Sequence, residues 1–412
     1  MFDTFQQFIT EQKNTHMTHI EDLVLDGGVR GTRDAILALR SLRDMLAGHS
    51  SSSRVTVKWD GAPAVFAGID PNDGEFFVAK KGIFNKNPKV YKSHADIDED
   101  IAGADLNAKM KVAYTELKKL GIKGVVQGDI MFTSDDLSTD KIKGDEYVTF
   151  HPNTILYAVP TSSPQAAVLK KAKIGVVFHT EYSGSNFEDM KASYGVDVNK
   201  FRKVSSVWAV SANLPSAIGG LMSADETKEV TAALSTAGKI FNKTRAGILK
   251  ELETNEELNK MVNIYNNQKV RARQAITNTR QHAAGLKKFI NDRMDAEIAK
   301  KKTDAAKNVW QGRKDELMSV FKTYNVTDWQ TVFDLQNSIV AAKMIIINKL
   351  NKLNNVDTFV KTKNGFRVTG AEGFVAIDKL GGSAVKLVDR LEFSSNNFST
   401  DVIKGWDSPS RG

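Results

Sequence analysis

The stretch that decides the fold is VTVKWDGAPAVFAGIDPNDGEFFVAKK, residues 55–81. It contains three short β-type runs, VTVKW, AVFAG and EFFVA, separated by the turn signals Asp60-Gly61 and PNDG. Short strands joined by tight turns predict an antiparallel meander. Lys58 stands at the end of the first run, directly before a turn, where its amine can reach a bound ligand.

The rest of the chain divides into β-rich and helix-rich parts. Apolar residues recur at helical spacing within 36–46 and 106–120, and further β runs follow at GVVQGDIMF, TILYAV and IGVVFHT. Residues 223–355 contain no proline and many helix formers, which predicts four to six helices. The β pattern returns at FRVTG, GFVAI and AVKLV, so we expect the helices to be an insertion.

These patterns predict an α+β fold with five segments. They are an N-terminal helical segment (1–50), the first part of a β-rich domain (51–222), an inserted basic helical domain (223–356), the second part of the β-rich domain (357–392) and a poorly ordered tail (393–412).

The net charge of +8 is concentrated in the insertion. Between Asp225 and Asn355 the chain has 23 Lys and Arg against 15 Asp and Glu, an excess equal to the net charge of the whole chain. A basic domain beside a neutral one favours nucleic acid as the partner. Arg273, Arg280 and Lys287 recur every seven residues, which would place them on one helix face as nucleic-acid-binding residues. The alternative is a solvated face whose cations pair with acids one turn away.

Composition excludes several classes of protein. The absence of cysteine excludes disulfide scaffolds, zinc–thiolate sites and thiol nucleophiles, and it fits a reducing, cytoplasmic location. No apolar run approaches the roughly 18 residues of a membrane span, and the N-terminus lacks the pattern of a signal peptide. We therefore expect no membrane partner, and catalysis would have to use Lys, His, Ser or carboxylates.

Six short segments carry more information in their order than any of them does alone. The first is Lys58-Trp59-Asp60-Gly61, and the later ones are AKKG with Lys80 and Lys81, GDIMF with Asp129, ILYAV with Tyr157, EGFV with Glu372, and VKLV with Lys386. In this order they resemble the motifs of the covalent nucleotidyltransferase superfamily, which includes ATP-dependent RNA and DNA ligases and mRNA capping enzymes. A longer match over residues 58–92 is similar to proteins encoded by large tailed phages.

The resemblance implies an antiparallel-rich nucleotidyltransferase (ligase adenylation) domain that binds ATP and Mg²⁺. Lys58 would attack the α-phosphate to form a lysyl-AMP intermediate, and AMP would then pass to the 5′-phosphate end of a polynucleotide. Glu372 and Asp129 would bind the metal or the ribose. The other residues expected to bind the nucleotide are Asp60, Gly61, Lys80, Lys81, Tyr157 and Lys386, with Tyr157 lining the base pocket.

Three positions depart from the family pattern. Asp129 stands where Glu is usual, Val388 stands where the last motif has a second lysine, and Pro63 replaces a basic residue. These departures leave open a catalytically inactive nucleotide-binding relative, a phage structural or interaction protein that keeps the ligase fold, and an AMP transferase with another acceptor. Only 22 residues follow Arg390, too few for the oligonucleotide-binding barrel of DNA ligases. The resemblance therefore favours an RNA-ligase-like enzyme and RNA over DNA.

Overall fold

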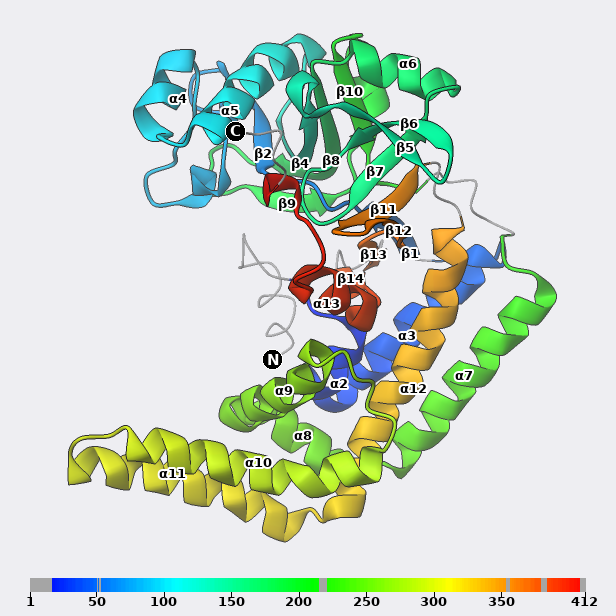
Figure 1. Ribbon diagram of the computed structural model, residues 1–412. Helices are drawn as coiled ribbons and strands as arrows, with labels where there is room; N and C mark the ends of the chain where they lie inside the picture. The colour runs from blue at the N-terminus through cyan, green and yellow to red at the C-terminus, as the bar shows by residue number, and fades with distance from the viewer. Residues whose placement is uncertain are drawn as a thin grey trace.

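The computed structural model describes residues 17–49, 51, 53–214, 221–352, 356–378 and 384–407. Figure 1 shows a C-shaped molecule, with a β-rich half at one end and an arm of two long helices at the other. Helices and predominantly antiparallel sheets make up the fold, so the predicted mixture of the two is confirmed. In the part of the chain that the structure describes, no helix combines the length and the apolarity that a membrane span requires.

A six-stranded sheet forms the centre of the β-rich half. Its strands run in the order β10-β8-β4-β2-β3, with β9 paired to β8, and only the β10–β8 pair is parallel. The bounds are β2 Ala64–Ile69, β3 Phe76–Ala79, β4 Val125–Thr133, β8 Ile174–Ser183, β9 Lys191–Tyr194 and β10 Val207–Ser211. The predicted amphipathic helix is confirmed as α5, Ala104–Leu117, and its buried Met110, Ala113 and Leu117 pack against this sheet. The short helix α4, His94–Asp100, precedes α5.

A five-stranded antiparallel sheet joins the two parts of the chain that flank the inserted helices. Its order is β12-β11-β7-β6-β5, so β11 returns from the insertion to pair with β7. The bounds are β5 Ser138–Ile142, β6 Asp145–Phe150, β7 Leu156–Pro160, β11 Asp357–Thr362 and β12 Gly365–Val368. Helix α6, Pro164–Lys171, follows β7.

The third sheet carries the Lys58 segment. It consists of β1 Ser53–Lys58, β13 Gly373–Asp378 and β14 Ala384–Leu387, in the order β1-β13-β14. The predicted meander is therefore wrong at its first strand, because β1 pairs with β13 while β2 pairs with β3 and β4. Alternation along the strands places Val55, Val57, Phe374, Ala376 and Leu387 on the face that packs against the helices.

The described residues between β10 and β11 form six helices, within the predicted range of four to six. They are α7 Ala224–Lys243, α8 Ala246–Thr254, α9 Glu256–Arg271, α10 Thr279–Ala299, α11 Asp304–Thr323 and α12 Val326–Asn351. Five of them begin at a side-chain cap, which sets their starts locally: Ser223, Asn255, Asn278, Thr303 and Asn325. Helices α10 and α11 form the projecting arm in Figure 1.

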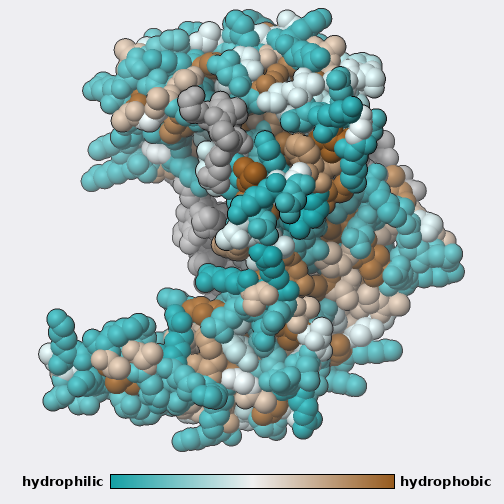
Figure 2. Space-filling model, in the orientation of Figure 1, coloured by the Kyte–Doolittle hydropathy of each residue, from teal (hydrophilic) through white to brown (hydrophobic). Residues whose placement is uncertain are grey.

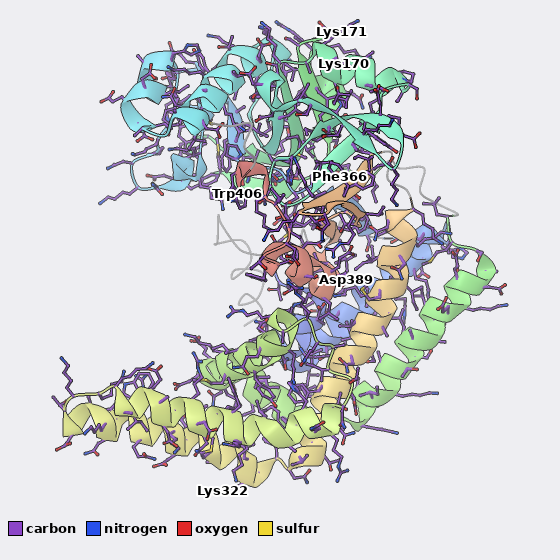
Figure 3. All side chains as sticks on the ribbon, in the orientation of Figure 1. Lys170, Lys171, Lys322, Phe366, Asp389 and Trp406 are labelled. Carbon is purple, nitrogen blue, oxygen red and sulfur yellow. The ribbon has the colours of Figure 1, made fainter. Side chains whose placement is uncertain are left out.

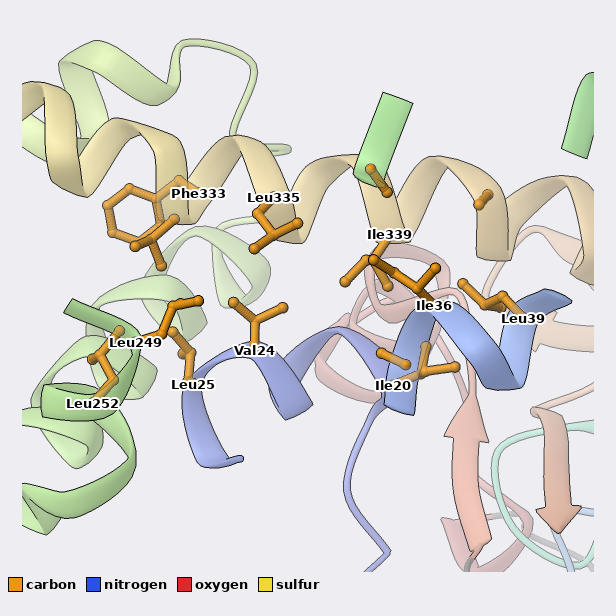
Figure 4. Packing of buried hydrophobic residues seen from close by; sticks show 14 of the residues in the cluster. Ile20, Val24, Leu25, Ile36, Leu39, Leu249, Leu252, Phe333, Leu335 and Ile339 are labelled. Atoms are coloured by element: carbon orange, nitrogen blue, oxygen red, sulfur yellow. The ribbon is translucent and has the colours of Figure 1, made fainter. Parts of the chain in front are cut away.

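The inserted helices do not form a core of their own. The N-terminal elements η1 Ile20–Asp22, α2 Leu23–Asp26 and α3 Gly28–Leu46 share one hydrophobic cluster with α7, α8, α12 and the third sheet. Figure 4 shows Ile36 and Leu39 of α3 facing Ile339 of α12, with Val24 and Leu25 beside Leu249. The predicted helix at 36–46 is confirmed within α3, but it belongs structurally to the same core as the insertion.

The C-terminal residues are ordered over most of their length. Helix α13 spans Arg390–Phe398, and the short helix η7 spans Gly405–Asp407. Between them Val402 bridges to Thr362, and Lys404 is buried. The predicted poorly ordered tail is thus wrong for residues 393–407, because hydrogen bonds to the five-stranded sheet hold them, while 408–412 lie outside the described residues.

Candidate active site

The turn after Lys58 is fixed by the buried carboxylate of Asp60. Its Oδ2 accepts hydrogen bonds from the backbone N–H groups of Thr154 (2.7 Å) and Ile155 (2.8 Å), and its Oδ1 accepts one from Asn153 Nδ2 (2.7 Å). Three donors thus engage both oxygens, and the residue is only 5% exposed. Asp60 positions the turn, and the structure gives it no role as an open nucleotide contact, although it lies at the edge of a small cavity.

Gly61 lets this turn approach the six-stranded sheet. A Cβ atom at position 61 would lie 2.6 Å from Asp129 Cβ and 2.8 Å from Met131 Sδ. Two backbone bonds close the contact, from Ala62 N to Ile130 O and from Ile130 N to Pro63 O, both 3.0 Å. The glycine is therefore needed for close packing beside Asp129.

Lys58 and Glu372 form an ion pair across two strands of the third sheet. Lys58 stands opposite Gly373 in the β1–β13 register, so the preceding Glu372 can reach the lysine amine. Glu372 is largely buried, whereas the Lys58 side chain is 27% exposed. Burial raises the pKa of Glu372 to about 7, while the nearby charge of Lys58 opposes this rise. The pair thus joins an accessible amine to a carboxylate that can take up a proton near neutral pH.

Gly373 allows that strand to come close to β14. Its φ is +153°, and a Cβ atom there would lie 2.6 Å from Leu387 O. On β14, Lys386 stands opposite Val375, and Val375 in turn stands opposite Thr56. Because side chains alternate along a strand, Lys386 and Lys58 project from the same face, opposite the helical core. Burial, followed by the charge of Lys58, lowers the pKa of Lys386, which places the two amines in one electrostatic environment.

Asp129 and His179 face this pair from the six-stranded sheet. Asp129 lies on β4 and His179 on β8, with His179 Nε2 3.7 Å from Asp129 Oδ2. Burial raises the pKa of Asp129 to about 7, and burial with the charge of Lys58 lowers the pKa of His179 to about 4. His179 Nδ1 also lies 2.7 Å from Thr180 Oγ1. At neutral pH this histidine is uncharged, so its contact with Asp129 is not an ion pair.

His19 is a site residue that sequence reasoning missed. The N-terminal segment runs beside β14, where Lys386 N donates to Thr18 O (2.9 Å) and His19 forms a parallel bridge with Lys386. His19 Nδ1 is buried without a hydrogen-bond partner among the described residues. Burial lowers the pKa of His19 to about 2, with further lowering by four cations: Arg390, Lys343, Lys386 and Lys58. No local pattern marks His19, because only the fold brings it to Lys386.

The position of the missing second lysine is closed to a ligand. Val388 is buried, and its carbonyl oxygen accepts a hydrogen bond from Lys343 Nζ of α12 (2.8 Å). Arg390 cannot replace that lysine in this arrangement, since its guanidinium donates to Asp22 (2.8 Å) and Asn267 (2.6 Å). Within the described residues, Lys386 is the basic side chain that β14 contributes to the site.

Two other predicted nucleotide-binding residues are placed differently from expectation. The Tyr157 ring does not line an open pocket, because it is buried between Trp59 and Phe150 and its hydroxyl accepts from Asp60 N (2.7 Å). Lys80 turns to Asp100, at 3.3 Å, away from the Lys58 cluster.

Lys81 is exposed, and its charge acts on Asp129, opposing the rise in the pKa of that carboxyl. It is therefore the member of the lysine pair that faces the site. The structure brings together five of the predicted residues: Lys58, Lys81, Asp129, Glu372 and Lys386.

The three basic residues expected to bind nucleic acid do not share one helix. Helix α9 ends at Arg271 and α10 begins at Thr279, so Arg273 lies in the connection, with a φ of +58°. The predicted common face is wrong for Arg273 but fits Arg280 and Lys287, which are exposed on α10. None of the three forms an ion pair with another described residue, whereas the neighbouring Lys288 pairs with Asp292.

Comparison with known proteins assigns the chain to a family. No curated protein and no solved structure matches the chain. A family model matches residues 14–402, a span that includes all six predicted motifs and the inserted helices. The chain therefore belongs to DUF6267, a family of unknown function.

Proposed function

We propose that the protein is an ATP-dependent, RNA-ligase-like polynucleotide ligase built on the adenylation-domain fold. One observation carries the proposal: the amine of Lys58 is paired with Glu372 on the accessible face of the third sheet, beside Lys386 and opposite Asp129. An amine nucleophile, a proton acceptor and a cation for phosphate are the groups that adenylation of a lysine requires.

The first step is adenylation of Lys58. The Nζ lone pair attacks the α-phosphorus of ATP, a P–N bond forms, and the bond from that phosphorus to the bridging oxygen of the β-phosphate breaks. Pyrophosphate leaves with the electron pair of that bond. The Lys58 ammonium loses two protons in all: the first passes to Glu372 before the attack and frees the lone pair, and the second leaves with pyrophosphate. The raised pKa of Glu372, about 7, suits a group that accepts a proton at neutral pH. Lys386 would stabilise negative charge on the α-phosphate, and Lys81 would act on the outgoing phosphates.

Of the two predicted metal ligands, Asp129 fits a magnesium ion, while Glu372 is left to accept the proton from Lys58. Burial raises the pKa of Asp129 to about 7, so a divalent cation would stabilise its ionised form. Magnesium is usually held by one or two carboxylates together with phosphate oxygens and water. The described residues hold no cluster of three or more His, Asp or Glu that could bind a metal alone, which suits this shared mode. When bound, Mg²⁺ would neutralise charge on the phosphates.

The later steps concern the nucleic acid. AMP would pass from Lys58 to a 5′-phosphate end, and a 3′-hydroxyl would then displace AMP to seal the strand. Three exposed cations of α10 and of the α9–α10 connection form no ion pair with other described residues, and they support a polyanionic acceptor: Arg273, Arg280 and Lys287. RNA is favoured over DNA by the resemblance of the motifs alone.

A second candidate function is nucleotide binding without catalysis. Its support is the last motif, where Val388 is buried and the Arg390 guanidinium is committed to Asp22 and Asn267. Such a protein would bind ATP through the same residues but form no covalent adduct.

Covalent labelling tests the proposal. Purified protein is mixed with α-labelled ATP and Mg²⁺, denatured and separated on a gel, beside the variants Lys58→Ala and Lys171→Ala. Lys171 is an exposed lysine of α6 at the far end of the β-rich half (Figure 3), so its loss should leave the label unchanged. The label should disappear in K58A. An unlabelled wild-type band, with ATP still bound at equilibrium, would refute the ligase and favour the second candidate.

A further inference from the structure

Two aromatic side chains near the C-terminus are highly exposed. Phe398, at the end of α13, is 64% exposed, and Trp406 of η7 is 57% exposed; no other aromatic side chain in the described ranges is exposed to this extent. Figure 3 places Trp406 at the border of the hollow between the β-rich half and the helical arm, and Figure 2 shows that hollow lined mainly by hydrophilic residues. An exposed aromatic ring beside a hydrophilic hollow can stack on the base of a single-stranded nucleic acid.

The residues next to the two aromatic side chains are anchored through one side chain, that of Thr154. Thr154 Oγ1 donates to Asn397 Oδ1 (2.9 Å) and accepts from Lys404 Nζ (3.0 Å). Asn397 directly precedes Phe398, and Lys404 lies two residues before Trp406. Gly405 fixes the backbone further, since its N–H donates to Asn153 O (2.7 Å) and a Cβ atom there would lie 1.9 Å from His151 O. Hydrogen bonds therefore fix the backbone next to both rings.

Hydrogen bonds of the same residue, Thr154, continue to the candidate active site. The backbone N–H of Thr154 donates to Asp60, which fixes the turn directly after Lys58. A cavity of about 20 Å³, room for about one water molecule, lies between the turn and α13, with Asp60, Glu372 and Asn397 among its lining residues. The two aromatic residues are thus tied to the Lys58 turn by one chain of hydrogen bonds.

Basic residues lie beside the segment that carries the two rings. Lys361, Lys363 and Arg367 lie on β11, on β12 and between these strands, where Ile403 N donates to Lys361 O and Arg367 Nη2 donates to Asn396 Oδ1. Exposed acids near them include Asp357 and Asp401. On the other side, α13 contacts the end of α9 through Ser394 Oγ and Val270 O (3.0 Å), next to the exposed cations of the α9–α10 connection.

We propose that Phe398 and Trp406 form a stacking platform for the bases of a single-stranded polynucleotide end, with the flanking cations on its phosphates. Aromatic rings beside a basic groove are the general means by which proteins hold single strands without reading their sequence. The inference rests on the proposed function, because the platform would present that end to the AMP carried by Lys58. Stacking, unlike charge alone, requires bases, and this difference gives the test.

The test measures binding of a fluorescent 5′-phosphorylated single strand of about 12 nucleotides, in RNA and DNA forms, and of an abasic strand of equal length and charge. The variants are F398A, W406A and the double variant, with Val309→Ala as the control because Val309 is equally exposed (58%) on α11. Each aromatic variant should bind the normal strand roughly 5- to 150-fold more weakly, the range expected for one stacked base. All variants should bind the abasic strand as the wild type does.

Two outcomes would overturn the platform: no binding of single strands by the wild type, or variants that bind the normal strand as tightly as the wild type. W406F should retain most of the affinity, which separates stacking from a folding defect. Labelling of Lys58 with ATP, measured on the same variants, should be unchanged because neither ring contacts Lys58. If the wild type takes no label but the platform variants lose affinity, the ligase proposal fails and the platform stands. If Lys58 is labelled but the loss of either ring leaves the affinity unchanged, the platform fails and the ligase proposal stands.

Discussion

Lys343 is the residue whose replacement should most clearly expose how the inserted helices support the site. Its amine is buried on α12, with 1% of the side chain exposed, and donates to Glu21 Oε1 (2.9 Å), Glu21 Oε2 (3.0 Å) and Val388 O (2.8 Å). Lys343→Met preserves the apolar stem but leaves the Glu21 carboxylate and the Val388 carbonyl buried without this donor.

Removing one partner of a buried ion pair typically costs about 3–5 kcal/mol, because the other charge stays in the interior uncompensated. Arg390 Nη1, 3.8 Å from Glu21 Oε1, remains to offset part of that cost, so we expect about 3 kcal/mol for K343M. Adding Glu21→Gln should recover part of the loss, since the uncompensated charge is then gone. The two single variants should therefore be strongly non-additive.

Urea unfolding followed by far-ultraviolet circular dichroism measures the free energy of unfolding of these variants. The control is Lys349→Met, which removes a more exposed ion pair with Glu226 from the same helix and should cost clearly less. If K343M were as stable as K349M, or if K343M and E21Q were additive, the buried pair would not link the insertion to β14 as argued.

Three further predictions concern histidines and charge. Burial, with the charge of Lys269, lowers the pKa of His282 to about 4. This histidine is therefore neutral in the folded protein, and its contribution to stability is lost as the pH falls from about 6.5 toward 4. Between pH 7 and pH 5, the free energy of unfolding of the wild type, measured in urea titrations, should therefore fall by about 2 kcal/mol more than that of H282Q. Equal decreases in the two proteins would contradict this. The double variant Arg280→Ala, Lys287→Ala should reduce the slope of log K against log salt for oligonucleotide binding by roughly 1–2, whereas an unchanged slope would place the nucleic acid elsewhere. H19A removes the ring beside Lys386, the lysine proposed to bind phosphate, so adenylation of Lys58 should slow roughly tenfold, about the value of one hydrogen bond of Lys386, and an unchanged rate would remove His19 from the site.

Local sequence signals predicted most of the helices and strands. The apolar spacing in α3 and α5 and the caps of the inserted helices act within a few residues, so they can be seen without the fold. Strand pairing depends on distant partners, and here the prediction failed: β1 leaves its neighbour in sequence to pair with β13, more than 300 residues away. The turn that redirects the chain is held by Asp60, whose partners at 153–155 carry no pattern that marks them.

The same contrast applies to the site. Lys58, Asp129, Glu372 and Lys386 could be singled out because their motifs resemble those of a known family, and the fold brings them together, while their roles stay predictions. Tyr157 has a motif of the same kind but lies under the turn, because three aromatic rings pack there and bury its hydroxyl. Short motifs identify which residues approach a site, whereas burial decides which of them a ligand can touch.

The cluster of ionisable residues around Lys58 is assembled from three parts of the chain that are far apart in sequence. The N-terminal segment supplies His19, the β-rich half supplies Lys58 and Asp129, and β13 and β14 supply the remaining charges only after the inserted helices have been completed. Since α12 shares its core with α3 and its lysine holds the carbonyl of Val388, the insertion supports the end of the strand that carries Lys386. Deleting the insertion would therefore remove structural support from the strand that carries Lys386, together with the exposed cations of α10. Point variants of exposed cations therefore separate these two contributions better than truncation does, because only point variants leave the shared core intact.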